Sequence, residues 1–174
     1  MTQSVELLLD RDAEQSVRAV WARLAEADLP TEQRTTPSPS HRPHVTLFAG
    51  DALAEGADDA LPGLLAGLDL PLRLGGLLAF GPRKGSLVLA RQVVVDAALL
   101  ALQTRVAAVC GADPDGHFGP GRWTPHVTLA RRVPVAQLSA VVAALGELPE
   151  LTASSRRCRR WDSVQRETWE LTGR

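Results

Sequence analysis

The sequence predicts an α+β protein of two pseudo-symmetric lobes, each a mainly antiparallel sheet with helices on its outer face, around a central cleft. The main observation is that the pentapeptide Pro-His-Val-Thr-Leu occurs at Pro43–Leu47 and again at Pro125–Leu129. The two motif histidines are 126 − 44 = 82 residues apart. The segments before the two motifs also share a succession of patterns, an apolar run and then apolar residues at helical spacing. We therefore expect residues 1–174 to form one bilobal domain with an internal duplication.

The elements before each motif follow from the spacing of apolar residues. Val5–Leu9 and Leu87–Arg91 are short apolar stretches typical of strands. Ala13–Ala25 and Val95–Ala107 place apolar residues along one face of a helix. Both pairs align at the offset of 82 residues without a gap. Each half is therefore predicted to run as strand, helix, loop and motif strand.

The segments after each motif predict a further helix and additional antiparallel strands in each half. We expect helices at Asp58–Leu68 and Val135–Leu145, a strand at Leu70–Phe80 with a turn at Gly81–Gly85, and a strand pair at Thr152–Trp161 and Thr168–Thr172.

Two polar loops, broken by proline and glycine, lead directly into the motif strands. Thr31–Arg42 and Gly111–Thr124 occupy equivalent positions in the repeat, so we expect both to line the rim of one cleft. In the second loop, Phe118 and Trp123 are candidates to stack on a nucleobase, with the alternative that they pin the loop to the core. Arg122 is a candidate phosphate contact or a solvated surface residue.

Composition narrows the class of partner. The chain has 19 Lys and Arg against 20 Asp and Glu, a net charge of −1, so RNA would have to be recognised locally, through a cleft and an end group. No apolar run reaches the roughly 18 residues that span a bilayer, and the N-terminus has no secretory signal pattern. With only two cysteines, Cys110 and Cys158, these features favour a cytoplasmic protein, which we expect to be a monomer.

The His-x-Thr unit suits phosphate chemistry. Side chains alternate between the faces of a strand, so His44 shares a face with Thr46, and His126 with Thr128, while the apolar motif residues face the core. An imidazole gives or accepts a proton near neutral pH, and a hydroxyl donates a hydrogen bond to a phosphate oxygen. We therefore predict that one histidine takes a proton from water, the other protonates the departing oxygen, and the threonines hold the phosphate.

Two alternatives to acid–base catalysis stay open for these motifs. A duplicated packing element would preserve them without any reaction, and a metal site would need a third or fourth ligand. The other histidines, His41 and His117, lie in the two loops without ligand spacing, so we expect no metal and no other cofactor. Both are weaker candidates for substrate contact.

Four arginines gather near the C-terminus, where a strand is expected. They are Arg156, Arg157, Arg159 and Arg160. Because side chains alternate along a strand, these arginines occupy both faces. One face could line an RNA-binding groove, and the alternative is a solvated edge strand whose charges prevent aggregation.

At the two motifs the chain resembles the 2H phosphoesterase superfamily, named for its two His-x-Thr/Ser motifs. It is most similar to the bacterial branch known as 2'-5' RNA ligase or RNA 2',3'-cyclic phosphodiesterase. Pro125–Arg131 matches that branch throughout, whereas His44–Gly50 has one residue fewer before its glycine than the branch often has. The order of elements extends the similarity over essentially the whole chain.

The resemblance implies a bilobal fold with both histidines in a central groove. It also implies hydrolysis of a 2',3'-cyclic phosphate, at an RNA 3' end or on a small nucleotide, to a 2'-phosphate without a metal. By motif position, His44 and His126 are the acid–base pair, and Thr46 and Thr128 are the phosphate ligands. Arg131 matches a common arginine of the branch, although alternation from His126 turns it to the other face unless the strand bulges or ends.

Several functional questions stay open from the sequence. The near-symmetry does not identify which histidine is the base. RNA joining would have to be an ATP-independent reversal of the same chemistry, because the only lysine, Lys84, lies in Arg-Lys-Gly-Ser and not in the Lys-x-Asp-Gly context of ATP-dependent ligases. Other candidates are a phosphodiesterase for ADP-ribose cyclic phosphate or a 2'-5' linked oligonucleotide, and a catalytically idle RNA-binding module.

Overall fold

The computed structural model describes residues 2–36, 38 and 40–172. Its elements in chain order are β1 (Gln3–Leu8), α1 (Arg11–Glu26), β2 (His44–Gly50), α2 (Ala57–Leu64), β3 (Leu70–Arg83), β4 (Ser86–Val93), α3 (Ala97–Cys110), β5 (His126–Pro134), a 3₁₀ turn (Val135–Gln137), α4 (Leu138–Leu145), β6 (Leu151–Ser155), β7 (Arg157–Asp162) and β8 (Glu167–Glu170).

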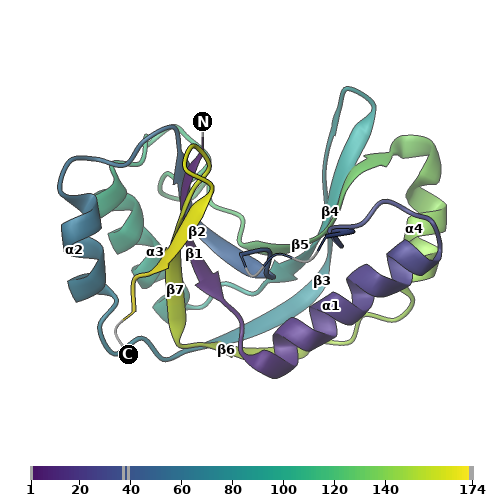
Figure 1. Ribbon diagram of the computed structural model, residues 1–174, viewed down its shortest axis with the longest axis horizontal. Coiled ribbons are helices and arrows are strands. Elements are labelled where there is room, and N and C mark those ends of the chain that lie inside the picture. Colours follow the sequence, from purple (N-terminus) through teal and green to yellow (C-terminus); the bar gives the residue numbers. More distant parts are fainter. Residues whose placement is uncertain (1, 37, 39, 173–174) are drawn as a thin grey trace.

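The strands form two four-stranded antiparallel sheets, one in each lobe (Figure 1). The first lobe contains the sheet β2-β1-β7-β8, with α3 packed on it and α2 beside α3. The second lobe contains the sheet β5-β4-β3-β6, with α1 packed on it and α4 beside α1. The predicted α+β class, with two lobes and helices on the outer faces of antiparallel sheets, is confirmed.

Each lobe is covered by a helix from the other half of the sequence. α1 follows β1 of the first sheet but packs on β5 and β6 of the second before the chain returns to β2. α3 follows β4 of the second sheet and packs on β2 of the first. A single buried cluster extends through both lobes. The two lobes are therefore interlocked, so neither half of the sequence forms a lobe by itself.

The gap-free offset of 82 residues is wrong for the elements before the motifs. Asp10 and Asp96 accept the first backbone hydrogen bonds of α1 and α3 as N-caps, and they are 96 − 10 = 86 residues apart. The offset falls to 82 at the motifs because α3 has 14 residues where α1 has 16, and because the loop at 111–125 is two residues shorter than the loop at 27–43. Constant spacing therefore holds at the motif strands only.

The expected strand Thr152–Trp161 is two strands that belong to different sheets. β6 pairs with β3, and β7 pairs with β1, because the chain crosses between the lobes at Arg156. The edge-strand interpretation of the arginines is also wrong, since β7 lies between β1 and β8. Arg159 and Arg160 are buried, and each has an acidic partner, Glu6 and Asp58 respectively.

Other expected boundaries differ by a few residues. β3 continues through Gly81 to Arg83, so the turn is shorter than predicted and contains Lys84 and Gly85. In the expected loop Thr31–Arg42, residues 37 and 39 lie outside the described residues. Both cysteines are buried and unpaired, and burial raises the pKa of the Cys110 thiol to about 12. Within the described ranges, no helix combines the length and apolar character needed to cross a bilayer.

Arg91 of β4 connects the strands of the second sheet through side-chain hydrogen bonds to backbone carbonyls. Its buried guanidinium donates hydrogen bonds of 2.7 Å to the carbonyl oxygens of Leu74, Gly75 and Pro149. The first two belong to β3, and Pro149 precedes β6. The side chain therefore satisfies carbonyl groups where β3 bends and where β6 approaches it, and a buried carbonyl without a donor is costly.

We predict that Arg91→Met lowers the free energy of unfolding by about 3 kcal/mol, because three buried carbonyl oxygens lose a charged donor. Urea denaturation at pH 7 measures the change. Arg105→Met, at an exposed position of α3, is the matched control and should change stability by less than about 0.5 kcal/mol. Equal stability of the two variants would contradict the structural role of Arg91.

Candidate active site

The two motifs line a single cleft between the lobes. Its volume is about 1120 Å³, and its lining includes His44 and Thr46 from β2 and His126 from β5. The apolar motif residues on the other face, Val45 and Val127 among them, are fully buried in the core. The predicted alternation of the motif side chains is therefore what the structure shows.

Both motif histidines are oriented by the same local contact. The Nδ1 atom of His44 lies 2.8 Å from the carbonyl oxygen of Arg42, and Nδ1 of His126 lies 2.8 Å from that of Thr124. A carbonyl accepts only, so Nδ1 carries a proton and donates it. Nε2 is therefore the atom of each ring that can give or accept a proton, and each ring orientation is set by the residue two positions earlier.

Each motif strand contains a β-bulge directly after the motif threonine. In β2, Val5 of β1 is opposite Phe48 while the next residue, Glu6, is opposite Thr46. In β5, Leu89 of β4 is opposite Ala130 while Ala90 is opposite Thr128. One extra residue in each motif strand shifts the alternation by one position.

The bulge in β5 corrects the expected orientation of Arg131. Simple alternation turns this side chain away from His126, but Leu129 and Ala130 are both buried and Arg131 enters the cleft. Its Nη2 atom lies 3.4 Å from the Thr128 hydroxyl, and its Nε atom lies 2.9 Å from the Glu32 carboxylate. The matching residue of β2, Ala49, also lines the cleft.

Three side chains donate hydrogen bonds to backbone carbonyls at the bulges. Two of them have no predicted role in the site, and the third, Trp123, has a different predicted role. The indole N–H of Trp21 in α1 donates to the Thr128 carbonyl at 3.0 Å, and that of Trp123 donates to the Thr46 carbonyl at 3.0 Å. Buried Gln103 of α3 donates to the carbonyls of Leu47, at 3.4 Å, and Phe118, at 3.0 Å. Gln103 lies on the apolar face of a predicted helix, and a polar residue at such a position is the sequence signal that could have indicated a buried hydrogen bond to the motif strands.

His44 faces a buried ionic network in the first lobe. Its Nε2 atom is 3.6 Å from Oε1 of Glu6, which also accepts a hydrogen bond of 2.7 Å from the Ser4 hydroxyl. Arg159 binds the other carboxylate oxygen at 2.8 and 2.9 Å. Burial opposes ionisation of Glu6, but the charges of His44 and Arg159 and these hydrogen bonds together hold its pKa below the usual value. Glu6 had no sequence signal, because it lies alone in an apolar run.

His126 has apolar and cationic surroundings. The ring of Phe80 packs against its imidazole with 4.7 Å between the ring centres. Burial is the main cause that lowers the pKa of His126, and the charges of Arg131 and His44 lower it further, against the hydrogen bond to Thr124. We therefore find two histidines with the same orientation but different electrostatic surroundings.

The remaining sequence candidates lie at the cleft with partners of their own. Phe118 is half-buried and packs against Phe48, with ring centres 5.9 Å apart. The indole N–H of Trp123 is hydrogen-bonded to the Thr46 carbonyl. Exposed Arg122 forms an ion pair of 3.2 Å with Asp115. His41 stacks on Trp21, and burial is the main cause that lowers its pKa. His117 is exposed at the rim.

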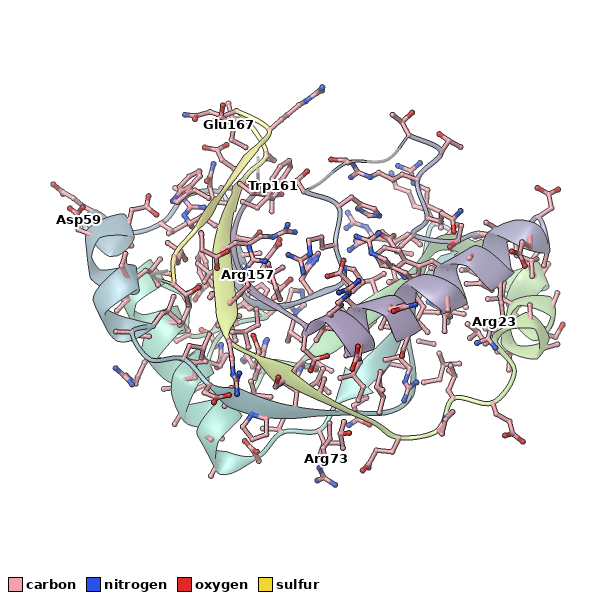
Figure 2. All side chains as sticks on the ribbon, turned by 60° about the horizontal axis from the view of Figure 1, so that its bottom comes forward. Arg23, Asp59, Arg73, Arg157, Trp161 and Glu167 are labelled. Carbon is pink, nitrogen blue, oxygen red and sulfur yellow. The ribbon has the colours of Figure 1, made fainter. Side chains whose placement is uncertain are left out.

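The cleft is basic although the chain as a whole is not. Six arginines and two glutamates line it, whereas the net charge of the chain is −1. Arg23 on α1, Arg73 on β3 and Arg157 on β7 are exposed arginines outside the cleft and lie on three different elements (Figure 2). Trp161 of β7, labelled in the same view, also lines the cleft. In the described part of the chain, no three His, Cys, Asp or Glu side chains gather as metal ligands. The site therefore concentrates positive charge where an anion would enter.

Solved structures with this fold include three from different organisms. Apo LigT of E. coli is 14% identical, with a TM-score of 0.59, and the match covers 97% of this chain and 93% of that one. TT0787 of Thermus thermophilus is 21% identical, with a TM-score of 0.58 and 98% of each chain covered. Usb1 of Kluyveromyces marxianus is 15% identical, with a TM-score of 0.55, and the match covers 98% of this chain and 97% of that one.

No curated protein matches the chain closely enough to count as a relative. A family model does match, over residues 12–166, and that span contains both motifs and nearly all the elements of the two lobes. The predicted resemblance to the 2H phosphoesterases is confirmed by this match and by the shared fold. The chain belongs to the 2'-5' RNA ligase superfamily.

Proposed function

We propose that this protein is a phosphodiesterase that hydrolyses the 2',3'-cyclic phosphate of an RNA 3' end or a small nucleotide to a 2'-phosphate, without a metal. The observation that carries the proposal is that His44 and Thr46 of one lobe and His126 of the other line one cleft, with the Nε2 atom of each histidine free of its backbone anchor. The Thr128 hydroxyl lies 3.4 Å from Arg131, which lines the same cleft. His44 and His126 form the acid–base pair, and Thr46 and Thr128 bind the phosphate.

The reaction follows from this pairing. A neutral imidazole takes a proton from the attacking water as the bond from its oxygen to phosphorus forms. The charged imidazole gives its proton to the 3' oxygen as the bond from phosphorus to that oxygen breaks, which leaves a 2'-phosphate and a free 3' hydroxyl. The threonine hydroxyls donate to the non-bridging oxygens, where charge accumulates. The reverse reaction would join RNA ends through a 2'-5' linkage without ATP.

A nucleotide substrate is supported by the cleft itself. Arginines around the motifs favour an anion, and the rings of Phe80, Phe118 and Trp161 offer apolar surface to a base. LigT of E. coli, a structural relative, has been solved in complexes with 3'-AMP and with ATP. An RNA end would be recognised locally in the cleft, because six arginines line it while the net charge of the chain is −1.

We predict that His44→Ala and His126→Ala each lower kcat by about 10²–10⁴-fold, since each variant removes one proton-transfer group. The assay is hydrolysis of a 2',3'-cyclic mononucleotide and of a cyclic-phosphate-ended oligoribonucleotide in chelator, with the product identified by ³¹P NMR. Retained activity in either variant would contradict the two-histidine mechanism, and loss of wild-type activity in chelator would favour a metal. Binding of RNA without turnover of either compound would favour an idle RNA-binding module.

Thr46→Ala and Thr128→Ala should have smaller effects, about 10–100-fold on kcat/KM, because each removes one hydrogen bond to a charged group worth about 1.5–3 kcal/mol. The same hydrolysis assay measures both variants. Thr104→Ala, at an exposed position of α3, is the matched control and should leave the rate unchanged. Loss in the control equal to that in the motif variants would show that the assay reports stability.

Trp21→Phe and Trp123→Phe test the support of the bulges. Each variant keeps an aromatic ring but loses the N–H that binds a motif carbonyl, so we expect the free energy of unfolding to fall by about 1 kcal/mol. We also expect kcat to fall by about tenfold because the threonine is displaced. Trp169→Phe, on the outer strand β8, is the control. An unchanged kcat with a raised KM in Trp123→Phe would instead favour base binding by that indole.

A further inference from the structure

The two lobes differ at one matched pair of positions beside the motif threonines. In the first sheet, Glu6 of the central strand β1 is opposite Thr46 on one side and Arg159 on the other. In the second sheet, the central strand β4 has Ala90 opposite Thr128 and Leu78. An ionic pair in one lobe therefore corresponds to an apolar pair in the other.

A second matched position differs in the opposite sense. The residue that enters the cleft after the bulge is Arg131 in β5 and Ala49 in β2. The first lobe thus adds a carboxylate beside its histidine, and the second lobe adds a guanidinium beside its own. The imidazoles share the same backbone anchor, and these two differences, together with the burial of His126 and the packing of Phe80 on it, make their surroundings unequal.

A buried carboxylate faces His44. Glu6 approaches Nε2 from β1 at 3.6 Å, and its carboxylate is held by Ser4 and by Arg159 of β7. Arg159 offsets part of the carboxylate charge, but it binds Oε2 while His44 faces Oε1. The charge of His44 promotes ionisation of Glu6, and the interaction is reciprocal, so the carboxylate stabilises the imidazolium.

The groups that face His126 favour a neutral ring. Phe80 of β3 covers one side, and Arg131 of its own strand and His44 of β2 add positive charge. The carboxylate of Glu32 is engaged by Arg131 at 2.9 Å. Burial and both charges lower the pKa of His126, so the neutral form persists to lower pH than for a free imidazole.

We propose that Glu6 is a positioning residue that keeps His44 charged, so that His44 is the proton donor and His126 is the proton acceptor. This inference rests on the proposed function. Nε2 of His126 takes the proton of the attacking water as the water oxygen bonds to phosphorus. Nε2 of His44 gives its proton to the 3' oxygen as that oxygen leaves. Exchange with solvent then returns the proton to His44 and removes it from His126.

The pH dependence of kcat tests the assignment, because the two variants should act on opposite limbs of the profile. His44 must be charged, so activity falls on the alkaline side as it loses its proton, and Glu6→Gln should move that limb to lower pH by about one unit. His126 must be neutral, so activity falls on the acid side, and Arg131→Gln should move that limb to higher pH. At pH 8 we expect Glu6→Gln to lower kcat about tenfold.

Three further variants separate the charge of Glu6 from its packing. Glu6→Asp keeps the carboxylate and should restore the alkaline limb. Ser4→Ala removes a hydrogen bond to the same carboxylate but leaves its charge, so the limb should stay near its wild-type position. Because Glu6→Gln leaves Arg159 buried without its partner, Glu6→Ala with Arg159→Leu copies the apolar pair of the second lobe, and it should move the same limb.

Imidazole ¹⁵N NMR of the full chain tests the protonation states without any turnover. We expect Glu6→Gln to change the response of the His44 nitrogens to pH and to leave that of His126 in place, because the carboxylate contacts His44. A movement of the acid limb by Glu6→Gln, no movement of either limb, or an unchanged response of the His44 nitrogens in Glu6→Gln would overturn the assignment. These failures are distinct from failure of the proposed function, which would appear as no hydrolysis by the wild type or as retained activity in the histidine variants.

Discussion

One extra residue in each motif strand decides which side chains enter the cleft. Without the bulges, strict alternation would direct Phe48 and Ala130 into the cleft and would turn Arg131 away from it. With them, two consecutive apolar residues enter the core in each strand, and the residue five positions after each histidine faces the histidine's side. The local chemistry of the site therefore depends on an irregularity of the backbone as much as on the motif residues.

The bulges are also points at which the two halves of the sequence contact each other. α1 begins in the half that contains His44, yet its Trp21 binds the carbonyl of Thr128 in the other half. Trp123, which precedes the second motif, binds the carbonyl of Thr46 in return. These hydrogen bonds connect the two halves of the sequence, and one core extends through both lobes, so the separation of the imidazoles is set by packed structure. Acid–base catalysis on one phosphorus atom requires this fixed separation.

Much of this arrangement could be predicted from the sequence, and the failures have identifiable causes. Apolar spacing located α1 and α3, and the repeated pentapeptide located the cleft-facing His44 and His126, because alternation in strands and periodicity in helices are local properties. The exchange of helices between lobes was not predictable, since packing partners leave no mark on the spacing of apolar residues. The alignment of the two halves at one constant offset failed because α3 has 14 residues where α1 has 16, and this difference leaves the apolar spacing within each helix unchanged.

Individual site residues were missed for a related reason. Glu6 is one acidic residue in an apolar strand, and its partner Arg159 is 153 positions away, so only the register of β1 with β7 brings them together. The orientation of Arg131 depended on whether its strand bulges, and the sequence did not decide this because the bulge contains no glycine. The edge-strand interpretation of the arginines near the C-terminus failed because the sequence did not show that the chain changes sheet at Arg156. After that change, β7 lies between β1 and β8.

The two motif strands supply two like groups, whereas the proposed hydrolysis needs two unlike ones. Both groups are imidazoles, and so the difference has to come from their neighbours. Two matched positions near the histidines differ, and neither contributes to the backbone anchor of an imidazole: Glu6 against Ala90, and Arg131 against Ala49. Each added charge has an opposite partner, Arg159 or Glu32, which limits the cost of placing it in a partly buried cleft. Symmetry of the backbone and asymmetry of charge are thus compatible, because different residues determine them.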